Sequence, residues 1–266
     1  MQIKDKTTSE CTDYKKEPIL AIKGYDEMPP FFMSLISRDN LWAFISSRGS
    51  LTAGRESAEK SIFPYVTVDK IHDNYGTTGP RTMIRLKGND LWEPFTPHAA
   101  KEPDIERTLS KGILGNSICF EERRVRDGLS FKYRWQPAGR FGLARTACLE
   151  NCSNQTVKLN ILDGIANILP PGLDSRMQAN SSVLTDAYKQ SELQSNSRMA
   201  LYSTASGITD RPEPMENLRA NCAWSSGLDE AAVTLDTKVP DAMIQARAID
   251  PCALNCGQRG AYWLHG

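Results

Sequence analysis

Four ionisable side chains lie close together in the segment 66–74, where Asp69, Lys70, His72 and Asp73 occur. If this segment is a strand, Lys70 and His72 lie on one face and the two aspartates on the other, because side chains alternate across a strand. A histidine oriented by a carboxylate can act as a general base or bind a sugar hydroxyl. We favour the alternative that His72 hydrogen-bonds to backbone at a loop edge while the charged side chains face water.

A second polar group flanks a predicted hairpin. Two strand-like runs, 41–45 and 50–53, are joined by a turn that contains Gly49, and glycine can take the positive φ that a tight hairpin needs. The polar residues at the edges of this hairpin are Arg38, Asp39, Arg48 and Arg55. Arginine forks can grip phosphate or carboxylate, and they can equally bridge strands or hold a neighbouring domain. The candidates for ligand or domain contact are therefore Arg38, Arg48, Arg55, Lys70, His72 and Asp73.

The chain has five tryptophans. An exposed tryptophan can stack on a sugar ring, but tryptophan in a strand usually packs in a core. We favour a core position for each of the five, and Trp92, in the segment 91–95 between loops, is the candidate among them for contact with a ligand. We expect the others to belong to the core.

Metal and cofactor signals are weak. Among the seven cysteines, the spacings of Cys148 with Cys152 and of Cys252 with Cys256 are permitted for structural zinc. Cys148 and Cys152, however, lie in and just beyond a strand pattern, where a free cysteine often serves as a small buried hydrophobe. The chain contains no Gly-rich phosphate loop, no GxSxG elbow and no HExxH motif. We expect no metal site and no cofactor.

The elements that must position these residues are mostly strands. Period-two alternation predicts three consecutive strands between 129 and 162, joined as an antiparallel meander. Other predicted strands are 231–235, 243–248 and 259–266, and short helices are expected within 103–114 and 182–194. Together these patterns predict a mostly β fold, a large antiparallel two-sheet β-sandwich with a few short helices.

Length and charge limit the classes of partner. We expect residues 1–18 to be a flexible arm and 19–266 to be one sandwich domain. Lys plus Arg number 32 and Asp plus Glu number 32, and this balance gives no reason to expect nucleic acid or an anionic membrane as a partner. No signal-peptide run and no stretch of about 18 apolar residues occurs. An odd number of cysteines without a secretion signal argues against a disulfide framework. We therefore expect a cytoplasmic protein.

Two blocks carry a family resemblance. The segment 35–55, LISRDNLWAFISSRGSLTAGR, followed by DKIHDN at 69–74, resembles the opening of the N-terminal β-sandwich of the large cellobiose-phosphorylase-like proteins. The segment 129–172 contains an L-x-N element at 149–151 and then LDGI-x-N-x-LP-x-G at 162–172, which resembles a second block of that domain. A weaker block at 210–218 adds little by itself.

The resemblance implies a supersandwich fold of galactose-mutarotase type and a non-catalytic role. The domain would support a helical-barrel catalytic domain of the same polypeptide and contribute to a homodimer. The parent protein would be a glycoside phosphorylase, a glycosyltransferase that binds an oligosaccharide or a sugar phosphate. Catalytic residues of the resembled proteins belong to the barrel, so no catalytic residue is assigned here, and we expect no turnover by this chain as a fragment of that parent.

Two alternatives stay open. The chain could be a stand-alone sugar-binding or aldose-mutarotase-type enzyme that uses His72 and a carboxylate. It could also be a protein-interaction module. A large exposed apolar surface would distinguish a domain that lacks its partner from a complete monomer, because monomers rarely expose more than a few hundred Å² of contiguous apolar surface.

Overall fold

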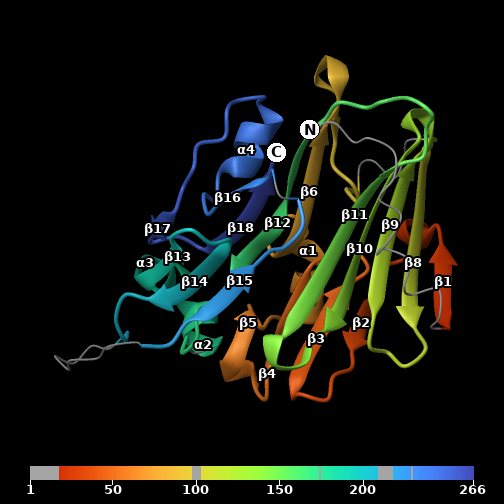
Figure 1. Ribbon diagram of the computed structural model, residues 1–266. Helices are drawn as coiled ribbons and strands as arrows, with labels where there is room; N and C mark the ends of the chain where they lie inside the picture. The colour runs from red at the N-terminus through yellow and green to blue at the C-terminus, as the bar shows by residue number, and fades with distance from the viewer. Residues whose placement is uncertain (1–17, 98–102, 174, 209–217, 229) are drawn as a thin grey trace.

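A computed structural model describes residues 18–97, 103–173, 175–208, 218–228 and 230–266. These residues form four antiparallel sheets and four short α-helices, so the predicted mostly β sandwich class is confirmed (Figure 1). Hydrogen bonding divides the strands of the sandwich among four sheets. Each sheet is named below after one of its inner strands. Most of the expected arm, residues 1–17, lies outside the described residues.

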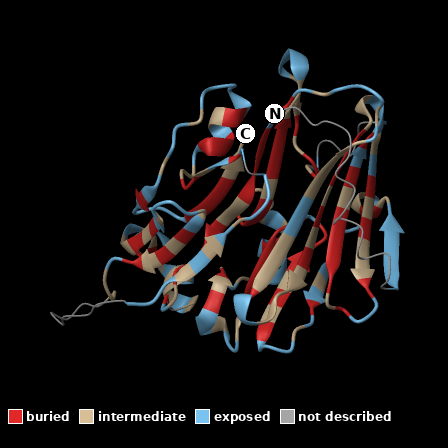
Figure 2. Ribbon diagram, in the orientation of Figure 1, coloured by how far each residue is buried: buried red, intermediate tan, exposed pale blue. Residues whose placement is uncertain are grey.

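The β10 sheet forms the right-hand group of strands in Figure 1. Its strands, in spatial order, are β1 (Ile19–Lys23), β8 (Ile105–Gly112), β9 (Ile118–Arg124), β10 (Leu129–Pro137) and β11 (Leu143–Asn151). β10 pairs with β11 in a continuous register that brings Trp135 opposite Arg145 and Tyr133 opposite Ala147. These four side chains therefore share the inward face of the sheet. At the far edge, β1 is exposed along its whole length (Figure 2).

The β3 sheet contains the predicted hairpin. Its strands, in spatial order, are β2 (Phe32–Leu35), β3 (Leu41–Ser46), β4 (Leu51–Arg55) and β5 (Ser61–Phe63). β3 and β4 pair antiparallel from Leu41 with Arg55 to Ile45 with Leu51, and Gly49 in the turn has φ 93°. The predicted hairpin and its positive-φ glycine are both confirmed.

The remaining strands form two more sheets. The β12 sheet consists of β16 (Ala232–Thr234), β18 (Gly260–His265), β12 (Asn160–Ile168), β6 (Gly79–Arg85) and β7 (Leu91–Trp92). The β14 sheet consists of β15 (Asn221–Trp224), β14 (Met199–Thr204), β13 (Lys189–Leu193) and β17 (Leu254–Cys256). In the β12 sheet, β12 lies between β18 and β6, which are distant from it in sequence.

Several local predictions are wrong. The expected helix within 103–114 is strand β8, because Arg107 and Leu109 alternate inward along it. The expected strand 66–74 contains helix α1 (Val68–Asp73), which buries Ile71. The expected strand 243–248 begins inside helix α4 (Val239–Ile244), where Pro240 and Asp241 occupy the first turn and favour helix initiation.

Two other predictions hold in part. The expected helix within 182–194 consists of α3 (Ser182–Tyr188), preceded by α2 (Ser175–Asn180), and the chain after it turns into strand β13. Three strands do occur in order after residue 129, but only β10 and β11 pair as neighbours. β12 does not pair with β11 and instead lies between β18 and β6 in the β12 sheet. The strands predicted near 231–235 and 259–266 are confirmed as β16 and β18.

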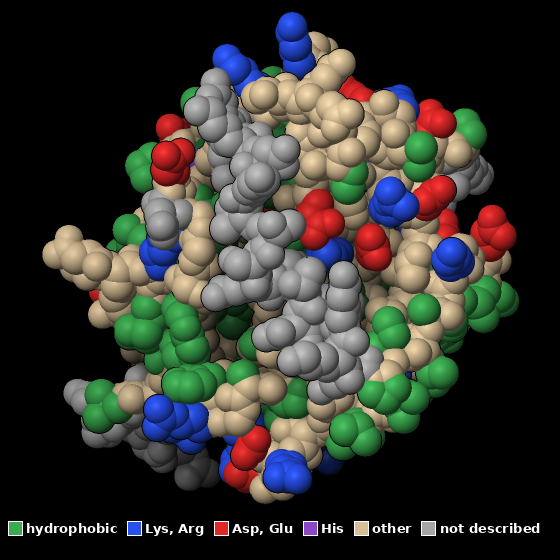
Figure 3. Space-filling view, turned by 45° about the vertical axis from the view of Figure 1, so that its right-hand side comes forward, with side chains coloured by type: hydrophobic (Ala, Val, Ile, Leu, Met, Phe, Trp, Pro, Cys, Tyr) green, Lys and Arg blue, Asp and Glu red, His purple; other side chains and the backbone are tan. Residues whose placement is uncertain are grey.

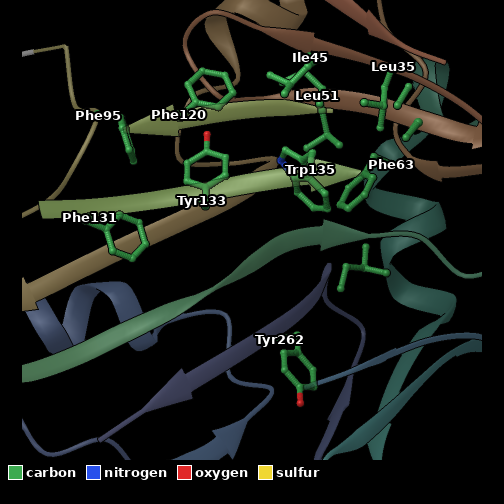
Figure 4. Close-up of a cluster of buried hydrophobic side chains, with 14 of the residues drawn as sticks. Leu35, Ile45, Leu51, Phe63, Phe95, Phe120, Phe131, Tyr133, Trp135 and Tyr262 are labelled. Atoms are coloured by element: carbon green, nitrogen blue, oxygen red, sulfur yellow. The ribbon is translucent and has the colours of Figure 1, made fainter. Parts of the chain in front are cut away.

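The main core lies between the sheets. Figure 4 shows Phe120, Tyr133 and Trp135 of the β10 sheet beside Ile45 and Leu51 of the β3 sheet. A second, smaller cluster lies on the opposite face of the β12 sheet, where α4 covers it. Its buried members are Met83, Leu162, Val239, Met243, Ala261 and Trp263. The β12 sheet is therefore buried on both faces.

Candidate functional site

Helix α1 is docked on the turn of the β3–β4 hairpin. Ser46 Oγ lies 2.7 Å from His72 Nδ1, and the Arg48 backbone N–H donates to the same Oγ at 3.1 Å. The Ser50 hydroxyl donates to the Ile71 carbonyl. Ser46 is 0% exposed, so its hydroxyl cannot reach a substrate as a nucleophile. The predicted polar cluster therefore holds a helix against a hairpin. His72 lies on that helix and bonds to a side-chain hydroxyl, not to backbone at a loop edge as in the interpretation that we favoured.

Arg48 and Asp73 stand at the outer edge of this contact. Arg48 Nη1 lies 3.8 Å from Asp73 Oδ1, and both side chains are exposed. Lys70 is exposed on the same helix. The structure thus brings Arg48, His72 and Asp73 to one end of the hairpin, but Asp73 faces Arg48 and His72 faces Ser46.

Replacement of Gly49 by valine should lower the free energy of unfolding by about 1–3 kcal/mol, because a β-branched residue is strained at positive φ. A side chain there would also meet the Tyr133 hydroxyl, which lies 3.0 Å from the position of a Cβ. Arg48→Ala is the matched control and should cost only about 0–1 kcal/mol, since its ion pair is exposed. Thermal melts compare the two variants. A larger loss from Arg48→Ala would show that the roles within this turn are reversed.

The remaining arginine candidates lie at the open end of the hairpin. Arg55 Nη2 donates to the carbonyls of Gly139 and Arg140 at 3.2 and 3.1 Å. Its Nη1 donates to the Asp39 carbonyl at 3.4 Å. Arg55 therefore joins the hairpin to the β10–β11 connection, while Arg38 is exposed nearby in sequence. The six polar candidates are divided between two ends of the hairpin and do not form one site.

Trp92 is a core residue. It is 3% exposed, and its Nε1 donates to Glu122 Oε1 at 2.7 Å. The Arg107 Nε donates to the other oxygen, Oε2, at 2.7 Å. The candidate role of Trp92 as a ligand contact is therefore wrong, because its ring and its polar atom are both occupied inside the protein.

A cleft that the sequence analysis did not identify lies where edge strand β11 faces β12, β18 and β15. Its volume is about 600 Å³. The inward residues Ile165 and Tyr262 of the β12 sheet form one wall, and Leu143 and Ala147 of β11 form part of the other. β11 is the last strand of the β10 sheet, so its inward face is left partly open. Clefts of this size with aromatic lining are typical small-ligand sites.

One buried ion pair spans this cleft. Arg145 Nη1 and Nη2 donate to the two Asp163 oxygens at 2.7 and 2.8 Å. Thr82 Oγ1 donates to Asp163 Oδ1 at 2.5 Å, and the Arg145 guanidinium lies over the Tyr133 ring, 4.8 Å from its centroid. Burial would lower the pKa of Arg145, yet the Asp163 carboxylate holds that pKa above its ordinary value. Arg145 therefore keeps its charge, and its hydrogen bonds to Asp163 link the two layers.

Two aromatic side chains meet at the rim of the cleft. Phe141, from the β10–β11 connection, and Trp224, from β15, pack edge to face with centroids 5.7 Å apart. They are 56% and 49% exposed. In the same lining, Ser225 Oγ lies 2.7 Å from the Tyr262 hydroxyl, which donates to the Arg198 carbonyl at 2.6 Å. The cleft lining thus combines exposed aromatic rings with hydroxyl groups.

The sequence did contain a signal for this cleft. Arg145 occupies an inward position of an alternating strand, and Asp163 interrupts the apolar run of β12. A charge at an inward position needs a buried partner. Two such charges of opposite sign predict that their strands face each other, which is how β11 and β12 are placed.

The described residues also bear on metal binding and on membrane-spanning helices. Among the described residues, no group of three or more His, Cys, Asp or Glu side chains is arranged to hold a metal ion. In the part of the chain that the structure describes, no helix is long and apolar enough to cross a lipid bilayer.

Comparison of the chain with protein-family models and with curated proteins gave no match to either. The resemblance to cellobiose-phosphorylase-like proteins therefore stays a prediction.

Proposed function

We propose that this chain is a non-catalytic, carbohydrate-binding β-sandwich domain of a glycoside-phosphorylase-like protein, and that the cleft beside β11 holds the sugar. The observation that carries the proposal is the exposed aromatic pair Phe141 and Trp224 in one cleft lining with the Ser225 and Tyr262 hydroxyls. A pyranose ring has an apolar face and a polar edge. An aromatic ring beside hydroxyl groups is complementary to both.

Binding is favoured over catalysis because the ionisable groups are already engaged. Asp163 accepts hydrogen bonds from Arg145 and Thr82, so it is occupied as an acceptor. A mutarotase-like mechanism would need His72 beside a carboxylate. The nearby carboxylate of Asp73 does not serve, since Asp73 pairs with Arg48 and His72 bonds to Ser46.

Two further observations support the proposal that the chain is a domain of a larger, cytoplasmic glycoside-phosphorylase-like protein. Edge strand β1 exposes Ile19, Leu20 and Ile22, which is apolar surface that a supported catalytic domain or a second copy could cover. The cysteines in the described part of the chain are thiols rather than disulfides, which suits the reducing cytoplasm. The helical-barrel partner and the homodimer remain part of the proposal through the family resemblance.

Trp224→Ala should abolish most saccharide binding, because one stacked ring is removed from the mouth of the cleft while β15 stays paired. The measurement is isothermal titration of the purified protein with cellobiose and longer glucans, with tryptophan fluorescence as a second readout. Trp42→Phe is the matched control, since Trp42 packs on Phe44 and Tyr65 away from the cleft lining. If Trp224→Ala bound saccharides as well as the wild type does, this assignment of the cleft would be wrong.

Incubation of the purified chain with cellobiose and inorganic phosphate should release no sugar phosphate. The reason is that the ionisable groups of both candidate regions are held in internal pairs. Chromatographic detection of glucose 1-phosphate checks this expectation. Phosphorolysis that disappears in His72→Ala would instead establish a complete enzyme centred on α1.

A further inference from the structure

The charge of the cleft lining is balanced internally. Among the described residues that line the cleft, only Arg145 and Asp163 carry a formal charge, and each neutralises the other through two hydrogen bonds. The rest of the lining is apolar, hydroxyl-bearing or backbone. The lining therefore has no net charge to offer a ligand.

The internal charge balance of the cleft lining makes it a poor site for anions. A phosphate or carboxylate that enters a partly desolvated cleft loses hydration and needs a cation or several donors in return. The terminal nitrogens of the Arg145 fork are taken by Asp163, and only Nε of this guanidinium is buried without a hydrogen-bond partner. The Asp163 carboxylate would repel the incoming anion, and the buried Nε is out of reach of a ligand in the cleft.

Three arginines lie near the cleft but outside its lining. Arg55 is held by the Gly139 and Arg140 carbonyls of the β10–β11 connection, to which its Nη2 donates. The Arg140 guanidinium lies over the outside of the Phe141 ring, 4.7 Å from its centroid, and is exposed to solvent. Arg198 donates to the carbonyls of Gly227, Leu228 and Ala231, and so it supports the loop behind the wall. Water around the exposed Arg140 side chain weakens its attraction for an anion in the cleft, because a high dielectric lowers the Coulomb energy. The face in Figure 3 likewise shows acidic and basic side chains interspersed rather than a field of one sign.

We propose that the cleft selects uncharged saccharides and rejects sugar phosphates and acidic sugars. The inference rests on the proposed carbohydrate-binding function and narrows its ligand class. Of the two ligands that the family resemblance implies, oligosaccharide and sugar phosphate, the charge-neutral lining favours the first. The polar contacts would come from the Ser225 and Tyr262 hydroxyl oxygens, which would accept hydrogen bonds from sugar hydroxyls.

The test is a pairwise titration of the purified protein with glucose against glucose 1-phosphate, and with cellobiose against cellobionic acid. We expect the neutral member of each pair to bind at least roughly tenfold more tightly, because one uncompensated charge has a large effect in a partly desolvated site. Affinity for the neutral sugar should not change between low and high salt. If the anionic member bound equally well or better, the charge inference would be overturned and carbohydrate binding would stand. If neither member bound, the proposed function itself would fail.

A charge-change pair of variants gives an independent readout. Ser226 lines the cleft on an exposed loop, so Ser226→Lys adds a cation and Ser226→Glu adds an anion at the same point. Ser226→Lys should raise the ratio of sugar-phosphate to neutral-sugar affinity, and Ser226→Glu should lower it further. Lys87→Gln, in the turn between β6 and β7, is the control for a charge change outside the lining and should leave the ratio unchanged. An unaltered ratio in Ser226→Lys would contradict selection by charge.

Discussion

Replacement of Asp163 by alanine should lower the free energy of unfolding by about 3–5 kcal/mol, because it leaves the buried Arg145 guanidinium without its partner. The Thr82 hydroxyl would lose its acceptor as well. Urea denaturation followed by far-ultraviolet circular dichroism measures the loss. The effect should be among the largest of any single substitution, since an unpaired buried charge costs more than a lost contact.

A double variant separates the charge effect from general disruption. Arg145→Met with Asp163→Leu removes both charges, and apolar replacement of a buried pair is often neutral or stabilising. We therefore expect the double variant to recover most of the stability that Asp163→Ala loses. A double variant as unstable as the single one would show that packing, rather than the unpaired charge, explains the loss.

Replacement of Glu122 by alanine should also cost about 3–5 kcal/mol, since this carboxylate accepts from three buried donors. They are Trp92 Nε1, Arg107 Nε and the Phe95 backbone N–H, at 2.7, 2.7 and 2.5 Å. Burial raises the pKa of Glu122, and the Arg107 charge and these donors oppose that shift. The substitution would leave the Arg107 charge with only the longer contact to Asp26, at 3.5 Å, and two neutral donors without an acceptor in the core.

Glu106 provides the matched control on the neighbouring strand. It pairs with Arg123 at 3.6 Å, and both side chains are more than half exposed. Glu106→Ala should change the free energy of unfolding by about 0–1 kcal/mol, as exposed pairs do. Equal losses from the two glutamates in urea denaturation would contradict the importance of the buried network.

The parts of the fold that could be predicted from sequence are those set by neighbouring residues. The β3–β4 hairpin follows from two apolar runs and one glycine, and β10 with β11 follows from strict alternation. In a short segment, the spacing of apolar residues does not distinguish a strand from a helix. In α1, six residues fit either a strand or a helix turn, and the docking of Ile71 and His72 on the hairpin selects the helix.

The candidate site depends on partners that are distant in sequence. Phe141, Arg145, Asp163 and Trp224 come together only because β12 leaves the meander and β15 belongs to another sheet. Sequence spacing does not specify such a crossover. The polar residues near His72 were a predicted site because they are adjacent in the chain. In the structure they make contacts between α1 and the hairpin.

The position of β18 within the β12 sheet affects how the protein can fold during synthesis. β6, β12 and β18 are made in that order, with long stretches of chain between them, yet β18 lies between β12 and β16. Until β18 has left the ribosome, one edge of β12 has no hydrogen-bonding partner, and Leu162 lacks the cover of Trp263. Contacts so distant in sequence form late, and an open apolar strand edge attracts other chains. The sheet that holds Asp163 is therefore completed only after β18 is made, and until then a chaperone has a defined edge to protect.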